Sequence, residues 1–133
     1  KVIVAMGSVC GTIKEVVDAQ RAKGKKVGLL RIISYRPFPY ARIYEALKCV
    51  PKVAVLDKAV SLGAYAPIAV EMKAAFYGKK KGPKVISSFV AGLGGRDITL
   101  ESVHEVFRRL TAKEVNSDFI DLKPELLKEE YGE

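Results

Sequence analysis

The stretch KVIVAMGSVCGT, residues 1–12, decides how the rest of the chain is interpreted. Val2 to Met6 is a continuous apolar run, which is typical of a strand that is covered on both faces of a parallel sheet. A turn bounded by two glycines follows, and Thr12 and Glu15 have the spacing of a helix capping box. We therefore predict a strand that leads directly into a helix beginning at Thr12, the first step of a βαβ unit.

The alternation of strand and helix continues along the chain. Further strands are predicted at 26–33, 52–57 and 84–90, and helices at 12–23, 40–48, 64–77 and 99–110. Pro67 is tolerated only in the first turn of its helix, which places that helix start near Ala66. Four strands and four helices predict an α/β fold, a three-layer α/β/α sandwich around a mainly parallel sheet of order 2-1-3-4.

Charge is divided unevenly along the chain. Residues 1–111 carry 20 basic and 8 acidic side chains, whereas residues 112–133 carry 3 and 7. Because the periodicity also ends there, we predict one domain over 1–111 and an extended or poorly ordered acidic tail over 112–133. The chain opens on Lys1 in strand-like sequence, so we expect it to be a piece of a longer polypeptide.

Basic residues crowd two short segments, 21–26 and 79–84. A phosphate-rich or acidic protein partner is one interpretation, but we favour a solvated lysine surface. Nucleic acid is not expected as a partner because no nucleic-acid-binding motif accompanies the charge. No apolar run of about 18 residues and no signal-peptide pattern occur, so we expect a cytoplasmic protein without a membrane segment. Cys10 and Cys49 form no metal or disulfide pattern, and we expect buried thiols.

A ligand crevice is expected where the strand order reverses, between the first and third strands. Residues 7–11 and 57–58 would flank this crevice. The turn lacks both the dinucleotide and the NTP-binding glycine patterns. Ser8, Gly11 and Thr12 nevertheless form a weak candidate anion site beside the predicted helix start.

Catalytic residues are not evident. His104 is the only histidine, and without a nucleophile motif we interpret it as structural. We interpret Asp57, Arg96 and Asp97 as residues that fix loops by hydrogen bonds, because they form no acid and base pair. We predict that this chain has no catalytic residue, no metal site and no cofactor-binding residue beyond the weak anion candidates.

Several segments together resemble one family, the C-terminal part of the α chain of pyruvate:ferredoxin oxidoreductase. The resemblance spans residues 2–110 and includes Ala5-Met6-Gly7-Ser8, Arg36-Pro37-Phe38-Pro39, Val53 to Ser61 and Gly92-Leu93-Gly94-Gly95-Arg96-Asp97-Ile98. It implies a transketolase C-terminal-like domain. It further implies a whole enzyme that decarboxylates pyruvate with thiamine diphosphate and magnesium, passes electrons through iron–sulfur clusters to ferredoxin, and forms acetyl-coenzyme A.

Within such an enzyme, the resemblance implies that this chain is a structural and assembly domain, inactive alone, with other domains or subunits as partners. The catalytic residues of the family have no matching positions here, and its antiparallel edge strand precedes Lys1. Binding of a small anion or coenzyme A at the crevice is the alternative. Ala66 to Tyr77 carries few charges, so we also expect self-association or contact with another subunit through this helix or an open sheet edge.

Overall fold

The computed structural model describes residues 1–123 and 125. Strands and helices alternate in the predicted order. Their bounds are β1 Val2–Met6, α1 Val9–Ala22, β2 Gly28–Ile32, α2 Tyr40–Leu47, β3 Lys52–Asp57, α3 Pro67–Phe76, β4 Val85–Val90, the 3-10 turn η1 Leu93–Gly95, α4 Leu100–Arg109 and β5 Asp118–Phe119.

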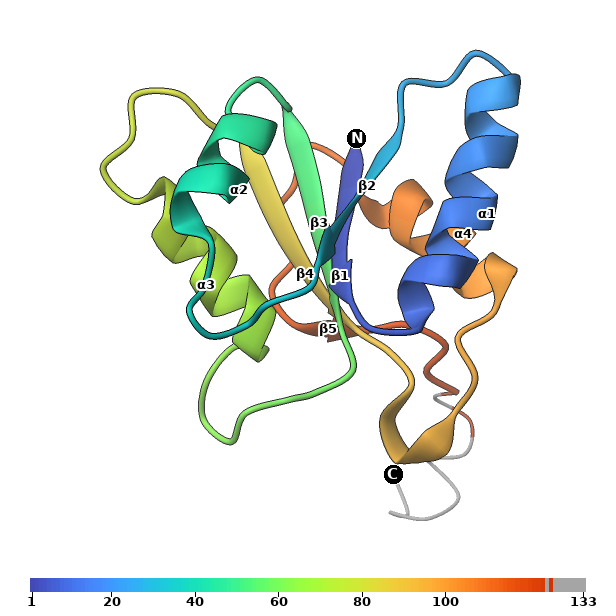
Figure 1. Cartoon of the computed structure of the whole chain (residues 1–133). Helices are drawn as coiled ribbons and strands as arrows, with labels where there is room; N and C mark the ends of the chain where they lie inside the picture. The colour runs from blue at the N-terminus through green and yellow to red at the C-terminus, as the bar shows by residue number, and fades with distance from the viewer. Residues whose placement is uncertain (124, 126–133) are drawn as a thin grey trace.

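The five strands form one sheet in the order β2-β1-β3-β4-β5. Every neighbouring pair is parallel, with Val4 of β1 opposite Leu30 of β2 and Val55 of β3. The predicted α/β class and the order 2-1-3-4 are confirmed, and β5 extends the sheet beyond β4 (Figure 1). The first reversal of strand order lies between β1 and β3, where the crevice was expected.

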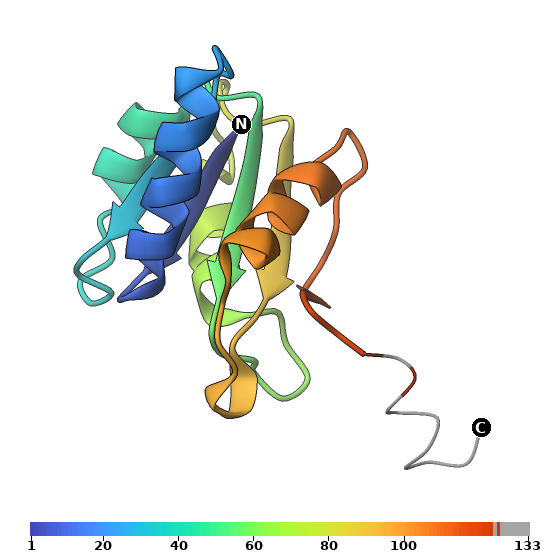
Figure 2. The ribbon, with the colours of Figure 1, turned by 90° about the vertical axis from the view of Figure 1, so that its right-hand side faces the viewer.

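Two helices cover each face of the sheet, which gives the three layers (Figure 2). Helices α1 and α4 enclose one apolar core, which includes Ile3, Phe89 and Phe107. Helices α2 and α3 enclose the other, which includes Val55 and Met72. All six residues of β4 are buried, as expected for a strand covered on both sides.

Helix α1 begins at Val9 rather than at the predicted Thr12, so that prediction is wrong. Gly7 has a φ of 85°, which lets the chain turn sharply after β1. The first helical turn then buries Val9 and Cys10 against the sheet. This burial outweighs the local capping signal, and Thr12 lies inside the helix.

A capping box does form at α4. The Thr99 side chain accepts a hydrogen bond from the Ser102 main-chain N–H at 3.1 Å, and the Ser102 hydroxyl accepts one from the Thr99 N–H at 3.0 Å. Both residues therefore fix the start of α4 at the predicted place.

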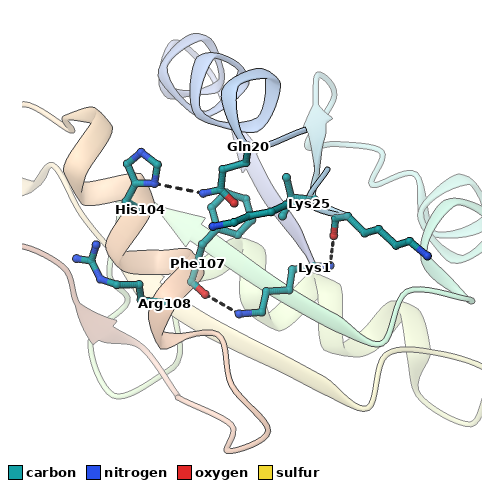
Figure 3. A pocket seen from close by; sticks show the side chains of 8 residues that line it. Lys1, Gln20, Lys25, His104, Phe107 and Arg108 are labelled. Atoms are coloured by element: carbon teal, nitrogen blue, oxygen red, sulfur yellow. Dashed lines mark hydrogen bonds between the residues drawn. The ribbon is translucent and has the colours of Figure 1, made fainter. Parts of the chain in front are cut away.

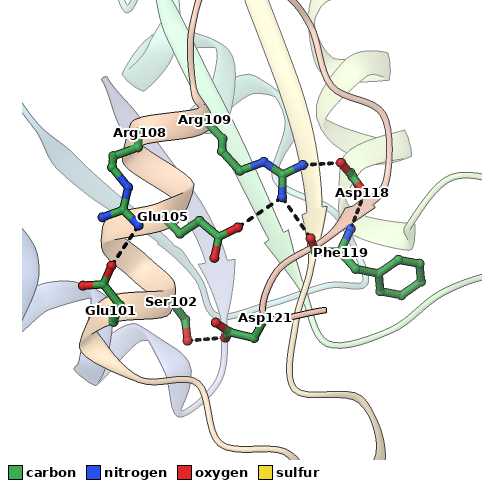
Figure 4. A network of polar contacts seen from close by, with 8 residues as sticks. All are labelled: Glu101, Ser102, Glu105, Arg108, Arg109, Asp118, Phe119 and Asp121. Atoms are coloured by element: carbon green, nitrogen blue, oxygen red, sulfur yellow. Dashed lines mark hydrogen bonds and ion pairs between the residues drawn. The ribbon is translucent and has the colours of Figure 1, made fainter. Parts of the chain in front are cut away.

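The segment from Val115 to Asp121 is not a free tail. Ser88 N donates to the Val115 carbonyl at 2.8 Å and Ile120 N donates to the Val90 carbonyl at 2.9 Å, so the segment lies along β4. Arg109 of α4 contacts Asp118 and donates to the Phe119 carbonyl at 2.9 Å (Figure 4). These residues are therefore extended and paired with β4 rather than poorly ordered, and the prediction of an extended or poorly ordered tail over 112–133 is otherwise untested.

The same segment is also tied to the start of α4. The Ser102 hydroxyl donates to the Asp121 carboxylate, and Ile120 is buried with 5% of its surface exposed (Figure 4). Residues 124 and 126–133 of the predicted tail lie outside the described residues. The domain limit at residue 111 stays a prediction.

Candidate functional site

The expected crevice is present at the carboxyl ends of the strands. It is a hollow of about 260 Å³. Its lining residues are Ser8, Val9, Thr12, Lys58, Gly95, Arg96, Asp97 and Ile98. Two sequence-predicted anion candidates, Ser8 and Thr12, therefore line the same hollow as two cations, Lys58 and Arg96, and one carboxylate, Asp97.

Lys58 follows β3 directly, and its side chain is held close to the glycine-rich loop. A Cβ atom at Gly92 would come within 2.9 Å of the Lys58 Cε atom, and Gly92 has a φ of 72°. Gly92 therefore permits both the turn of the chain and the close passage of Lys58. The position of Lys58 beside the crevice was predictable, but this packing was not.

Arg96 lines the crevice, and a hydrogen bond to the segment after β5 fixes its position. Its Nη1 atom donates to the Asp121 carbonyl at 3.0 Å, which leaves Nη2 without a partner among the described residues. The segment that continues β5 thus helps to position one of the two cations of the crevice. Sequence analysis missed this role because it treated the segment as a tail.

The first turn of α1 is a poorer anion site than its sequence indicates. Cys10 N donates to the Gly7 carbonyl at 3.2 Å, and Gly11 N donates to the Ser8 carbonyl at 3.0 Å. Gly11 is exposed and does not line the crevice, unlike Ser8 and Thr12. Any anion there would depend more on the side chains than on main-chain N–H groups.

Asp57 ends β3 on the face covered by α3. The residue is 2% exposed, and its Oδ1 accepts a hydrogen bond from Ile68 N in the first turn of α3 at 3.4 Å. Among the described residues, Oδ2 has no hydrogen-bond partner. Burial raises the pKa of Asp57 to about 6, against the smaller opposing effect of the Ile68 and Ala69 N–H groups.

Arg36 and Tyr40, at the two ends of the Arg36-Pro37-Phe38-Pro39 loop, both contact Glu71 of α3. Arg36 Nη2 donates to Glu71 Oε1 at 2.6 Å, and the Tyr40 hydroxyl donates to Oε2. The hydrogen bond from Tyr40 and the contact with Arg36 lower the pKa of Glu71. The motif therefore joins α2 to α3, and it lies away from the lining of the crevice.

His104 does not line the crevice; it lies in the middle of α4, facing Gln20 in the last turn of α1 (Figure 3). Its Nδ1 atom is 3.2 Å from Nε2 of the buried Gln20, which donates if the histidine carries its proton on Nε2. Both residues border a hollow of about 590 Å³, together with Lys1 and Phe107. No carboxylate and no Ser, Thr or Cys side chain is among the described residues that line this hollow beside His104.

In residues 1–123 and 125, no group of three or more His, Cys, Asp or Glu side chains is placed to hold a metal ion. No helix in that part of the chain has the length and apolar character needed to cross a membrane. Cys10 is buried as expected, but Cys49 is exposed, because it lies in the turn between α2 and β3.

Fold and crevice together define a parallel α/β domain of the class that binds ligands at the carboxyl ends of its strands. Residues 1–103 match the family model described as pyruvate:ferredoxin oxidoreductase core domain II. The chain therefore belongs to this family.

Relatives that match most of the chain are pyruvate synthase subunits. The chain is 44% identical over 132 residues to subunit PorA of Methanosarcina barkeri, a match that covers 95% of this chain and 33% of that protein. It is 47% identical to PorA of Thermotoga maritima, covering 80% of this chain and 27% of the relative.

The chain also matches a longer protein, the pyruvate-flavodoxin oxidoreductase of Klebsiella pneumoniae. They are 43% identical over 112 residues, which cover 83% of this chain and 10% of the relative. The chain thus spans about a third of the length of the PorA subunits and a tenth of this longer relative.

Proposed function

We propose that this chain is a structural and assembly domain of an α subunit of pyruvate:ferredoxin oxidoreductase. The match of residues 1–103 to core domain II carries the proposal. Thiamine diphosphate, magnesium, iron–sulfur clusters and coenzyme A would then be bound by other parts of the enzyme, and ferredoxin would be reached through the complex.

This proposal can be tested by measuring pyruvate oxidation with this chain alone and with the complete enzyme. This chain alone should give no pyruvate-dependent reduction of a viologen dye, whereas the complete enzyme should. Removal of residues 1–121 from the complete α polypeptide should abolish co-purification with the other subunits. Dye reduction by this chain alone, or normal assembly without it, would contradict the assembly role.

Helix α3 is the surface that we propose for contact with another domain, subunit or copy. Its residues Ile68, Ala69 and Met72 are buried by its own sheet, but Val70 is 45% exposed and Tyr77, just after the helix, is 89% exposed. Sedimentation should show association of the chain that weakens in Val70→Lys. A strict monomer at about 100 μM would count against self-association, since specific dimers commonly bind more tightly than that.

A second candidate function is binding of a small anion or coenzyme A at the crevice. The meeting of Ser8 and Thr12 with Lys58 and Arg96 around one hollow favours it. Calorimetry with inorganic phosphate and with coenzyme A should give saturable binding that is lost in Ser8→Glu and kept in Lys14→Glu, on the exposed side of α1. Absence of heat at millimolar ligand would dispose of this candidate.

A further inference from the structure

The N-terminal edge of the sheet carries a dense set of cations. In a parallel sheet, all turns that lead from a helix into the next strand lie at this edge. Three such turns, at the top of Figure 1, include residues 21–26, 48–52 and 77–84, which contain no Asp or Glu, whereas the fourth, between α4 and β5, contains Lys113 and Glu114. We call the basic residues of these three turns, with Lys1 just before β1, the basic edge: Lys1, Arg21, Lys23, Lys25, Lys26, Lys48, Lys52, Lys79, Lys80, Lys81 and Lys84.

Hydrogen bonds hold these turns against one another. Lys84 N donates to the Pro51 carbonyl at 2.9 Å, which joins the turn before β4 to the turn before β3. The Lys1 main-chain nitrogen donates to the Lys26 carbonyl at 3.0 Å, which joins β1 to the turn before β2. Burial, followed by the charges of Lys52 and Lys25, lowers the pKa of the Lys1 side chain. The basic edge is therefore one continuous surface, and its positive charges repel one another.

Few counter-ions offset this charge. Within residues 1–123 and 125, Lys48 is the one member of the basic edge in an ion pair, at 2.6 Å from Glu45. Lys1 Nζ donates to the Phe107 carbonyl at 2.8 Å and Lys79 Nζ lies 5.1 Å from the Tyr44 ring centroid, but neither of them has a carboxylate as its partner among the described residues. A concentration of unpaired like charge raises the local concentration of an oppositely charged partner and speeds its association.

Apolar surface lies between the charges. The hollow of about 590 Å³ beside Lys1 and Lys25 is lined by Val27 and Phe107 (Figure 3). A neighbouring hollow of about 390 Å³ shares these lysines and is lined by Val2 and Val50. Lysines around apolar hollows suit side chains that combine an apolar stem with a carboxylate, as Glu does.

The residue types indicate the kind of contact. Ten of the eleven members are Lys, and a lysine ammonium is strongly hydrated, so it is depleted from permanently buried interface cores. Binding to single-stranded nucleic acid depends on stacking of successive bases on aromatic faces. Tyr77 is the one exposed aromatic residue in the three turns.

We propose that the basic edge is a transient docking surface for a protein with a carboxylate-rich face. This role goes beyond assembly of the oxidoreductase, because it requires a surface that stays accessible in the complete enzyme. The contact depends on charge and is weakened by salt, since exposed charges are screened over about 10 Å at 0.1 M ionic strength.

A fluorescein-labelled poly-glutamate peptide is the probe, and the complete polypeptide that contains this chain is the receptor. Anisotropy at about 25 and 200 mM NaCl should show binding that weakens by about tenfold or more at the higher salt. The triple variant Lys79→Gln, Lys80→Gln, Lys81→Gln should weaken binding at low salt by about tenfold. The matched variant Lys14→Gln, Arg42→Gln, Lys123→Gln removes equal charge elsewhere and should change it by less than about twofold.

Carbodiimide coupling maps the contact, because it joins a lysine amine to a carboxylate with loss of water. The peptide should couple to lysines of the basic edge in preference to Lys14. Even coupling over all lysines, equal losses in both triple variants, or tighter binding of a single-stranded DNA of matched length would each overturn the proposal. Loss of subunit assembly in the lysine variant would instead assign this edge to the assembly interface.

Discussion

The two edges of the sheet differ in how their polar groups are held. At the carboxyl edge, Asp57 is buried, Lys58 packs against Gly92, and Arg96 is bonded to the segment after β5. At the N-terminal edge, the charges of the basic edge are mostly exposed, and Lys48 is the one member with a counter-ion among the described residues. The polar groups of the carboxyl edge are therefore fixed by burial and specific contacts, whereas the charges of the basic edge are mostly solvated and act through their electric field.

The first prediction, with the largest effect, concerns Asp57. Its pKa of about 6 lies above the ordinary value of 3.8, so the folded state binds the proton more tightly than the unfolded state. Stability contributed by this group falls as pH rises from about 4 to 6, by about 3 kcal/mol in total. Asp57→Asn should therefore be more stable than the original chain by up to about 3 kcal/mol at pH 8 and nearly equal at pH 4.

Urea unfolding at the two pH values measures this difference. Asp97→Asn, at the same edge but exposed, is the control and should alter stability little at either pH. An equal effect of Asp57→Asn at pH 4 and pH 8 would mean that the Asp57 carboxylate is not the buried, poorly compensated charge described above.

The second prediction concerns Arg109, which fastens β5 to α4 near the carboxyl edge. Its guanidinium contacts Asp118, Glu105 and the Phe119 carbonyl (Figure 4). Arg109→Met should cost about 2 kcal/mol, because a partly buried network loses its central donor. Arg108→Met, which breaks only the exposed pair with Glu101, should cost less than about 0.5 kcal/mol.

Thermal unfolding compares these variants, and hydrogen exchange locates the effect. Faster exchange in Arg109→Met should be confined to the Ser88 and Ile120 N–H groups and their neighbours. Equal losses of stability in the two arginine variants would show that β5 contributes nothing beyond a surface ion pair.

The third prediction concerns Glu71, whose side chain is 13% exposed. Glu71→Gln keeps the shape but weakens the bonds from Arg36 and Tyr40, and should cost about 1.5 kcal/mol at pH 7. Because the folded-state pKa of Glu71 is lowered, this stabilisation is present above pH 4.5 and is lost as pH falls through the lowered pKa. The exposed Glu45→Gln is the control, and a difference between the two that persists at pH 2 would contradict this account.

The smallest effect is expected at the basic edge. The triple variant Lys79→Gln, Lys80→Gln, Lys81→Gln should raise stability by about 0.3 kcal/mol at low salt, because it relieves repulsion, and the gain should vanish at 1 M NaCl. A loss of more than about 1 kcal/mol would show that these lysines hold the fold, and the contrast between the edges would fail.

Much of the fold was predictable from local signals. Strand β3 has the predicted bounds, because its run of apolar residues ends at Asp57. Pro67 lies in the first turn of α3 as its missing N–H requires. The crevice followed from the strand order, which short connections and buried apolar strands largely determine.

Other features depended on contacts between distant residues. The Thr12 capping signal was misleading because burial of Val9 and Cys10 started α1 earlier. Strand β5 is two residues long and has no apolar run, so only its bonds to β4 and Arg109 reveal it. Arg96 reached its place at the crevice through the Asp121 carbonyl, a partner 25 residues away.

The sequence by itself determined the α/β class, the order of its first four strands, and the resemblance to the family. The spacing of apolar residues and the positions of glycine and proline restrict the backbone locally, and the family motifs are visible in the sequence itself. Only the tertiary structure decided three features: the burial of Asp57, the hydrogen bond that positions Arg96, and the proximity of the separate turns that form the basic edge. Burial and electrostatic fields depend on distances in space, and distances between residues far apart in sequence exist only after the chain has folded.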